Sequence, residues 1–162
     1  MGKKRVLFVC LGNICRSPAG EGVFRGLLEQ KGLQDDFEVD SAGTSTYHVG
    51  ETPDPRMRQA AAGRGYRLAG HSRRLAREDF EKFDLILAMD RSNMRHIRSA
   101  DRKGEYRHKV RLFCDFVPGS GLLDVPDPYY GGHDGFEKVL DLLEAGAHSL
   151  LEHMQSLPED GS

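Results

Sequence analysis

Short apolar runs that alternate with helix-length segments most constrain the fold of this 162-residue chain. Each run has the length and composition of a buried strand. The candidate strands are 6–9, 37–42, 84–89 and 110–116, and the candidate helices lie near 18–31, 54–64, 91–103 and 134–155. This alternation predicts a parallel sheet covered by helices. Ligands of such sheets bind beyond the carboxyl ends of the strands, so we expect a site in the loop after the first strand.

That loop carries a cysteine in a setting that suits anion binding. The run VLFVCLGNICRSP, at 6–18, passes from the first candidate strand through Cys10 to the first candidate helix. Pro18 suits the first position of that helix. Gly12 and Asn13 tolerate left-handed backbone, so successive N–H groups can curve around one point. We therefore expect an anion-binding loop that closes over Cys10.

The residue types in the loop suit a nucleophile that attacks phosphorus. A cysteine and an arginine separated by five residues are a weak signal alone, but the strand before and the helix after strengthen it. Backbone amides, the helix N-terminus and Arg16 would favour the reactive thiolate of Cys10. The planar guanidinium of Arg16 can hold two oxygens of a phosphoryl group. Ser17 can donate to the Cys10 sulfur or cap the helix, and both roles stay open.

Composition limits the partners and the compartment. The formal net charge is −2, so the overall field gives no reason to expect nucleic acid or an anionic membrane as partner. The basic residues at 3–5 resemble the start of a signal peptide, but polar residues interrupt the apolar run that follows. The three cysteines are sparse and lack the paired spacing of zinc ligands. We expect no metal, free thiols and a cytoplasmic location.

A second motif lies in the segment 117–133, a long loop rich in glycine and proline. Its DPYY run, at 127–130, would alone be a polar turn with surface aromatics. Together with the 6–18 run it gives a specific match. The sequence resembles the low-molecular-weight protein tyrosine phosphatase family from residue 5 to about residue 157. The segments DSAGT, GHSRR and AMD follow in family order at 40–44, 70–74 and 88–90.

We therefore predict an α/β fold, a flavodoxin-like three-layer sandwich with a four-stranded parallel sheet in the strand order 2-1-3-4. Residues 1–157 are expected to form a single phosphatase domain, and residues 158–162 a frayed C-terminal tail. The resemblance implies tyrosine-phosphorylated proteins as substrates and inorganic phosphate as a product. A bacterial-type tyrosine kinase is the partner that would supply such substrates.

The resemblance also implies catalytic roles, with Cys10 as nucleophile, Arg16 as ligand of the phosphate and transition state, and Asp127 as proton donor. A leaving phenolate gains charge that a positioned carboxylic acid neutralises, an effect of about 10²–10⁴-fold in rate. Asp127 would then take a proton from the water that hydrolyses the phosphocysteine. This route needs no metal and no organic cofactor. The rival carboxylate Asp90 is more simply a turn residue.

Other residues are expected to bind the phosphate or support the loop. The phosphate-binding candidates within the loop are Leu11, Gly12, Asn13, Ile14, Cys15 and Ser17. The resemblance implies that Asn13, Ser41 and His71 form a hydrogen-bonded brace that holds the loop ready for substrate. Without the resemblance, His71 would be interpreted as a structural histidine.

Aromatic residues are expected to form the walls of the pocket. Tyr47, Tyr129 and Tyr130, together with Leu11, would stack on a flat substrate ring. They would set a depth that phosphotyrosine reaches more readily than phosphoserine. The alternative interpretation of Tyr47 is an exposed loop tyrosine.

The two remaining cysteines have different interpretations. Cys15 is either a small buried apolar residue or a partner for a reversible disulfide with oxidised Cys10. The resemblance implies the second. Cys114 is expected in the core.

Three other functions are compatible with parts of the sequence. An arsenate reductase on the same fold would need additional cysteines, and residues 70–100 contain none. Protein-arginine phosphatases resemble this loop, but they carry threonine where Leu11 stands and lack the double tyrosine. A phosphate-binding module without turnover is opposed by the presence of Cys10, Arg16 and Asp127.

The first candidate helix contains two unexpected glycines, and a later one carries a stripe of arginines. Family members commonly carry alanine where this chain has Gly20 and Gly22, and each glycine in a helix costs about 1 kcal/mol relative to alanine. These glycines put the stiffness of the first helix in doubt. An arginine stripe at helical spacing is expected to be either a solvated face or a contact for an acidic partner or for the residues around a phosphopeptide. Its members are Arg91, Arg95, Arg98 and Arg102.

Overall fold

The computed structural model describes residues 2–129 and 132–158. Its four-stranded sheet is parallel and has the order β2-β1-β3-β4, which confirms the predicted topology. The strands are β1 (Lys4–Cys10), β2 (Phe37–Gly43), β3 (Leu85–Ala88) and β4 (Val110–Leu112). Cys10, the last residue of β1, pairs with Gly43 at the end of β2. The carboxyl ends of the two strands thus meet at the edge where a ligand site was expected.

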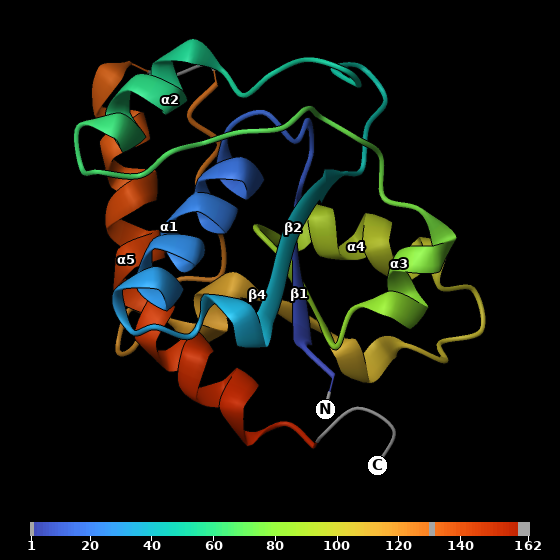
Figure 1. The fold of residues 1–162 in the computed structure, drawn as a ribbon. Coiled ribbons are helices and arrows are strands. Elements are labelled where there is room, and N and C mark those ends of the chain that lie inside the picture. The colour runs from blue at the N-terminus through green and yellow to red at the C-terminus, as the bar shows by residue number, and fades with distance from the viewer. Residues whose placement is uncertain (1, 130–131, 159–162) are drawn as a thin grey trace.

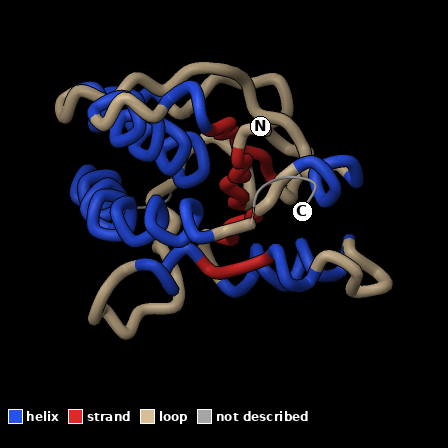
Figure 2. Tube along the Cα trace, turned by 60° about the horizontal axis from the view of Figure 1, so that its bottom comes forward, coloured by secondary structure: helices blue, strands red, loops and turns tan. Residues whose placement is uncertain are grey.

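Helices cover both faces of the sheet. In the described chain they are α1 (Arg16–Gln30), α2 (Pro55–Ala62), α3 (Arg77–Lys82), α4 (Arg91–Ala100) and α5 (His133–Ser156). Helices α1, α2 and α5 lie on one side of the sheet, and α3 and α4 lie on the other (Figure 1). The strands run between the two groups of helices, which gives the predicted three-layer sandwich (Figure 2). None of these described helices is long and apolar enough to cross a membrane.

The central strand β1 supplies side chains to both cores. Val6 and Phe8 pack in the larger core with residues of α1 and α5. Leu7 and Val9 pack in the smaller core with residues of α3 and α4. Because successive side chains of a strand point to opposite faces, both faces of β1 are buried. Cys10 continues the alternation and belongs to the larger core, on the α1 side.

The sequence misplaced one strand end and missed one helix. The predicted strand 110–116 ends at Leu112, because Phe113–Phe116 forms a buried 3₁₀ turn that continues the apolar run. Periodicity cannot separate these two arrangements in so short a run. Helix α3 has six residues, REDFEK, too few to show a helical period. Its first turn is fixed by the Asp79 carboxylate, which accepts a hydrogen bond from the Ala76 N–H at 2.7 Å.

The start of α1 also differs from expectation. The helix begins at Arg16, and Cys15 precedes it without a side-chain cap. The predictions that Pro18 takes the first helical position and that Ser17 caps the helix are therefore wrong. Pro18 is tolerated as the third helical residue because the first four N–H groups of a helix have no acceptor within it.

The two glycines of α1 allow close packing. A Cβ atom at Gly20 would lie 2.6 Å from Cδ1 of Phe8, and one at Gly22 would lie 2.4 Å from Cδ2 of Leu68. Both distances are too short for non-bonded carbon atoms. Glycine therefore lets α1 approach β1 and the segment around Leu68 more closely than alanine would.

Candidate active site

The loop between β1 and α1 closes around the Cys10 sulfur. Asn13 adopts left-handed backbone with φ 57°, and its N–H donates to Cys10 Sγ at 3.3 Å. The Ser17 hydroxyl lies 2.9 Å from the same sulfur. Cys10 is 3% exposed and Ser17 is fully buried. The Asn13 N–H, the Ser17 hydroxyl and the N-terminus of α1 thus converge on one buried sulfur.

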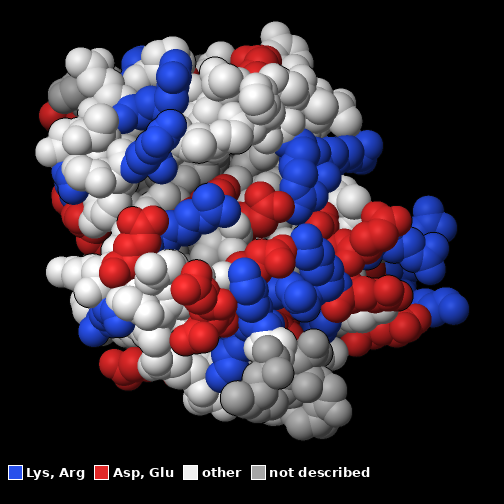
Figure 3. Space-filling view, in the orientation of Figure 1, with Lys and Arg blue, Asp and Glu red and all other residues white. Residues whose placement is uncertain are grey.

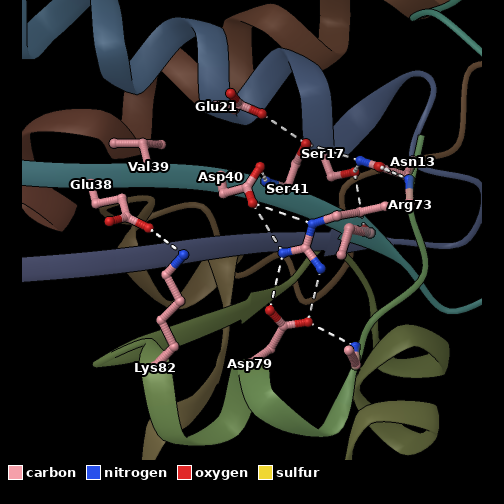
Figure 4. Close-up of polar contacts among 12 residues, drawn as sticks. Asn13, Ser17, Glu21, Glu38, Val39, Asp40, Ser41, Arg73, Asp79 and Lys82 are labelled. Carbon is pink, nitrogen blue, oxygen red and sulfur yellow. Dashed lines mark hydrogen bonds and ion pairs between the residues drawn. The ribbon is translucent and has the colours of Figure 1, made fainter. Parts of the chain in front are cut away.

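The side chain of Asn13 fixes the loop from two directions. Its Nδ2 donates to Ser17 Oγ at 2.8 Å and to Ser41 Oγ at 3.0 Å. Its Oδ1 accepts from the backbone N–H of Arg73 at 3.0 Å. Figure 4 shows Asn13 and Ser17 side by side, with Ser41 reaching towards them from β2. The structure therefore brings together Asn13, Ser41 and the loop, as the resemblance implied.

The far end of the brace is a glutamate instead of a histidine. The Ser41 hydroxyl donates to Glu21 Oε1 at 2.8 Å, and Arg25 lies 2.9 Å from Glu21 Oε2. Burial raises the pKa of Glu21, although Arg25 and the Ser41 hydroxyl oppose this effect. His71 is exposed, so the expected brace of Asn13, Ser41 and His71 is wrong in its third member. Only the short spacing between Glu21 and the loop could have suggested its role.

Arg73 anchors the segment that holds Asn13. Its guanidinium lies 3.0 Å from both Asp40 and Asp79, with two hydrogen bonds to each carboxylate (Figure 4). Burial lowers the pKa of Arg73, but the two carboxylates outweigh this effect and leave the pKa raised. These ion pairs join β2 and α3 to Arg73, whose backbone N–H donates to Asn13 in the anion loop. Ser72 adds a second link, because its hydroxyl donates to the Gly12 carbonyl at 2.8 Å.

Arg16 lies beneath the same pocket and connects it to two carboxylates. Its Nη1 donates to Asp90 at 2.6 Å and to the Val125 carbonyl at 3.0 Å, and its Nη2 donates to Asp127 at 3.5 Å. Burial alone would lower the pKa of Arg16, but the nearby negative groups, Cys10 first, leave it raised. Asp90 also caps α4 by accepting from the Asn93 N–H at 2.6 Å. The interpretation of Asp90 as only a turn residue is therefore incomplete.

Asp127 reaches the pocket from the segment between the 3₁₀ turn and α5. Its Oδ1 accepts from the Tyr129 N–H at 3.0 Å, which closes a local turn. Its side chain is 34% exposed, so the carboxylate contacts both Arg16 and solvent. Tyr130, the next predicted wall residue, lies outside the described residues.

The pocket above the sulfur has a volume of about 520 Å³. Its lining residues are Cys10, Leu11, Gly12, Ile14, Cys15, Arg16, Ser45, Tyr47, His48, Asp127 and Tyr129. Tyr47 is 83% exposed and Leu11 is 47% exposed, so both lie at the rim. The sequence missed His48, whose ring contacts Tyr47 and Tyr129 with centroid distances of 4.7 and 5.7 Å. Only the position of His48 next to Tyr47 in the sequence could have indicated that it lines the pocket.

The other cysteines are buried. Cys15 lines the pocket, and burial raises its pKa, with the Asp54 charge as the next cause. Cys114 lies in the larger core, as expected, and burial raises its pKa to about 11. Within residues 2–129 and 132–158, no group of three or more histidine, cysteine, aspartate or glutamate side chains could hold a metal ion.

All four members of the arginine stripe are exposed, and Arg91 is ion-paired. Arg91 contacts Asp124 at 3.0 Å, and Arg95, Arg98 and Arg102 lie on and just beyond α4. On the face drawn in Figure 3, basic and acidic side chains are mixed instead of forming a field of one sign. This mixing agrees with the small net charge of −2.

Comparison with known proteins identifies the family. The model of the low molecular weight phosphotyrosine protein phosphatase family matches residues 5–160. A putative low molecular weight protein-tyrosine-phosphatase from Synechocystis is 53% identical over 147 residues, covering 91% of this chain and 94% of that protein.

Solved structures agree. A protein tyrosine phosphatase from Entamoeba histolytica, with Hepes in its active site, has a TM-score of 0.89 and 39% identity, covering 94% of this chain and 97% of that one. The drosophila arginine phosphatase DARP has a TM-score of 0.86 and 31% identity, covering 94% and 99%. The chain therefore belongs to the low molecular weight phosphotyrosine protein phosphatase family and is an enzyme of that family.

Proposed function

We propose that the protein hydrolyses phosphotyrosine in proteins through a phosphocysteine intermediate on Cys10. One observation carries this proposal. A buried sulfur accepts a hydrogen bond from the Asn13 N–H and lies 2.9 Å from the Ser17 hydroxyl, in a pocket in which Arg16 and Asp127 lie 3.5 Å apart. A nucleophile, a phosphate ligand and an acid thus face one small volume, which is the arrangement that phosphoryl transfer to a thiolate requires.

In the first step, the Cys10 thiolate attacks phosphorus and the bond from phosphorus to the phenolic oxygen breaks. The loop amides from Leu11 to Cys15 and the guanidinium of Arg16 hold the phosphoryl oxygens. Asp127, in its protonated form, gives its proton to the leaving oxygen. The phenol departs, and the phosphate remains bonded to sulfur.

In the second step, water attacks the phosphocysteine. Asp127, now a carboxylate, takes a proton from this water as the bond between phosphorus and sulfur breaks. The leaving thiolate of Cys10 receives a hydrogen bond from Ser17, which lies 2.9 Å away. Inorganic phosphate leaves, and the enzyme returns to its starting state without a cofactor.

The pocket rim supports an aromatic substrate. Tyr47 and Tyr129 line the pocket with aromatic rings, and Leu11 adds an apolar side chain. Phosphoarginine is the second candidate substrate, because a solved arginine phosphatase shares the fold. The aromatic rim favours phosphotyrosine over that alternative.

The proposal extends to the substrates, the domain and the location of the protein. Tyrosine-phosphorylated proteins are the substrates, a bacterial-type tyrosine kinase supplies them, and residues 1–157 act as one phosphatase domain. The free thiols of Cys10, Cys15 and Cys114 support a reducing cytoplasm as the location.

The experiment compares phosphotyrosine, phosphoarginine and arsenate as substrates of the wild type and of Cys10→Ser. Phosphotyrosine should be turned over at least about tenfold faster than the other two. Cys10→Ser should abolish phosphotyrosine hydrolysis while it still binds vanadate. Faster turnover of phosphoarginine or arsenate would replace the proposed substrate, and substantial activity of Cys10→Ser would remove Cys10 from its role.

A further inference from the structure

Arg56, in the first turn of α2, connects elements on two sides of the pocket. Its Nε and Nη2 donate to the Asp54 carboxylate at 3.1 and 2.9 Å. Its Nη2 also donates to the Tyr129 carbonyl at 3.2 Å. Its guanidinium carbon lies 5.5 Å from the centroid of the Tyr129 ring and 4.9 Å from that of Phe136 in α5. A planar, delocalised cation suits all these contacts at once.

Tyr129 carries this contact to Asp127. The carbonyl of Tyr129 accepts from Arg56, and its N–H donates to Asp127 Oδ1 at 3.0 Å. The other oxygen of Asp127 lies 3.5 Å from Arg16 Nη2. Arg56 and Asp127 therefore hold opposite ends of the same residue, and a shift of Tyr129 would move the Asp127 carboxylate.

Asp54 connects the same unit to the anion loop. Its N–H donates to the Ile14 carbonyl at 2.8 Å, and its carboxylate accepts from the Arg56 N–H at 2.8 Å. Asp54 is only 7% exposed, so its position is fixed by these contacts and by packing. The pair of Asp54 and Arg56, named here the α2 clamp, joins the loop that binds phosphate to the segment that carries Asp127.

We propose that Arg56 is a positioning residue that sets the place of Asp127 relative to the anion loop. This inference rests on the proposed function, in which Asp127 protonates the leaving group. A general acid must lie within hydrogen-bond reach of the oxygen that it protonates. A misplacement of about 1 Å can cost about 10²-fold in rate. Loss of the α2 clamp therefore slows substrates that need the proton and spares those that do not.

The test uses four variants. Arg56→Gln keeps a polar side chain but loses the charge and the bidentate fork, whereas Arg56→Lys restores the charge alone. Arg58→Gln is the matched control, because Arg58 is an exposed arginine of α2 whose Nε donates to the Pro53 carbonyl at 3.1 Å. Asp127→Asn removes the acid itself.

The quantity to measure is kcat/KM, which reports the step in which the leaving group departs. The substrates are a phosphotyrosine peptide and 2,4-dinitrophenyl phosphate, whose leaving group needs no proton. Arg56→Gln should lose about tenfold on the peptide and less than about twofold on the dinitrophenyl ester. Arg56→Lys should lie between it and the wild type, and Arg58→Gln should change neither value. Vanadate affinity should stay within about twofold in both Arg56 variants.

Each contrary result has a defined meaning. Equal losses on both substrates, or no loss on the peptide, would overturn the positioning role of Arg56. If Asp127→Asn shows the leaving-group dependence and Arg56→Gln does not, this inference fails while the proposed function stands. If Asp127→Asn shows no such dependence, the proposed acid and this inference both fail. Should Arg56→Gln not fold, Arg56→Lys is judged by the same two substrates.

Discussion

Replacing Ser17 by alanine tests the link between the buried hydroxyl and the nucleophile. The hydroxyl oxygen accepts from Asn13 Nδ2 at 2.8 Å. Its own proton can go to Cys10 Sγ at 2.9 Å or to the Ala42 carbonyl at 3.4 Å. The sulfur is the nearer acceptor. Because Cys10 and Ser17 are both buried, water is poorly placed to replace the lost donor.

The expected magnitude follows from the energy of a hydrogen bond to a charged group. Such a bond contributes about 1.5–3 kcal/mol, and about 1.4 kcal/mol corresponds to a tenfold change in rate. Without this bond the Cys10 thiolate is a poorer leaving group, so Ser17→Ala should slow hydrolysis of the phosphocysteine by about tenfold to a hundredfold. The intermediate should then accumulate, and a burst of released phenol should appear.

Rapid mixing with p-nitrophenyl phosphate measures this effect. The amplitude of the burst reports the phosphocysteine that accumulates, and the steady-state rate reports its hydrolysis. Ser41→Ala is the control, because it keeps the Ser17 hydroxyl at the sulfur while it removes the second acceptor of Asn13 Nδ2 and the donor to Glu21. A loss in the steady-state rate below about twofold, or one equal to that of Ser41→Ala, would refute the proposed bond to the thiolate.

Three further predictions concern packing, titration and oxidation. Gly20→Ala should lower Tm, because the added Cβ would lie 2.6 Å from Phe8. The resulting strain of about 1–3 kcal/mol exceeds the gain in helix propensity of about 1 kcal/mol. A higher Tm would contradict the close packing. Burial raises the pKa of Glu21, so the folded state binds a proton more readily than the unfolded chain. Denaturant titrations should show the unfolding free energy of wild type relative to Glu21→Gln falling as pH rises from about 4 to about 7, and a constant difference would argue against it. Mild peroxide treatment and peptide mapping should find Cys10 joined to Cys15, whereas sulfonic acid alone at Cys10 would oppose a disulfide.

The parts of the fold and site that the sequence predicted are local in the chain. The four strands are short apolar runs that can be recognised without knowing what packs against them, and the anion loop lies within the 6–18 run. Helix α3 escaped prediction because its six residues gain stability from tertiary contacts, such as the burial of Phe80, instead of from a helical period. The end of β4 was misplaced because a buried 3₁₀ turn has the same apolar composition as a buried strand.

The supporting residues of the site could not be found in this way. Glu21 lies in α1, close to the loop in the chain, whereas Arg73 and His48 lie in loops far from Cys10. The partners of all three are set by how the layers pack. His71 shows the converse error, because family order suggested a contact that the exposed side chain does not make.

The sequence alone determined the strand, loop and helix that surround Cys10, because backbone geometry and residue type act there over fewer than fifteen positions. Only the tertiary structure decided which carboxylates face Arg16 and which residues fix Asn13. These pairings join the anion loop and the start of α1 to β2, to the segments that precede α3 and α4, and to the 117–129 segment. Hydrogen bonds between distant segments depend on distances of a few ångströms, and those distances exist only once the sheet and helices have packed.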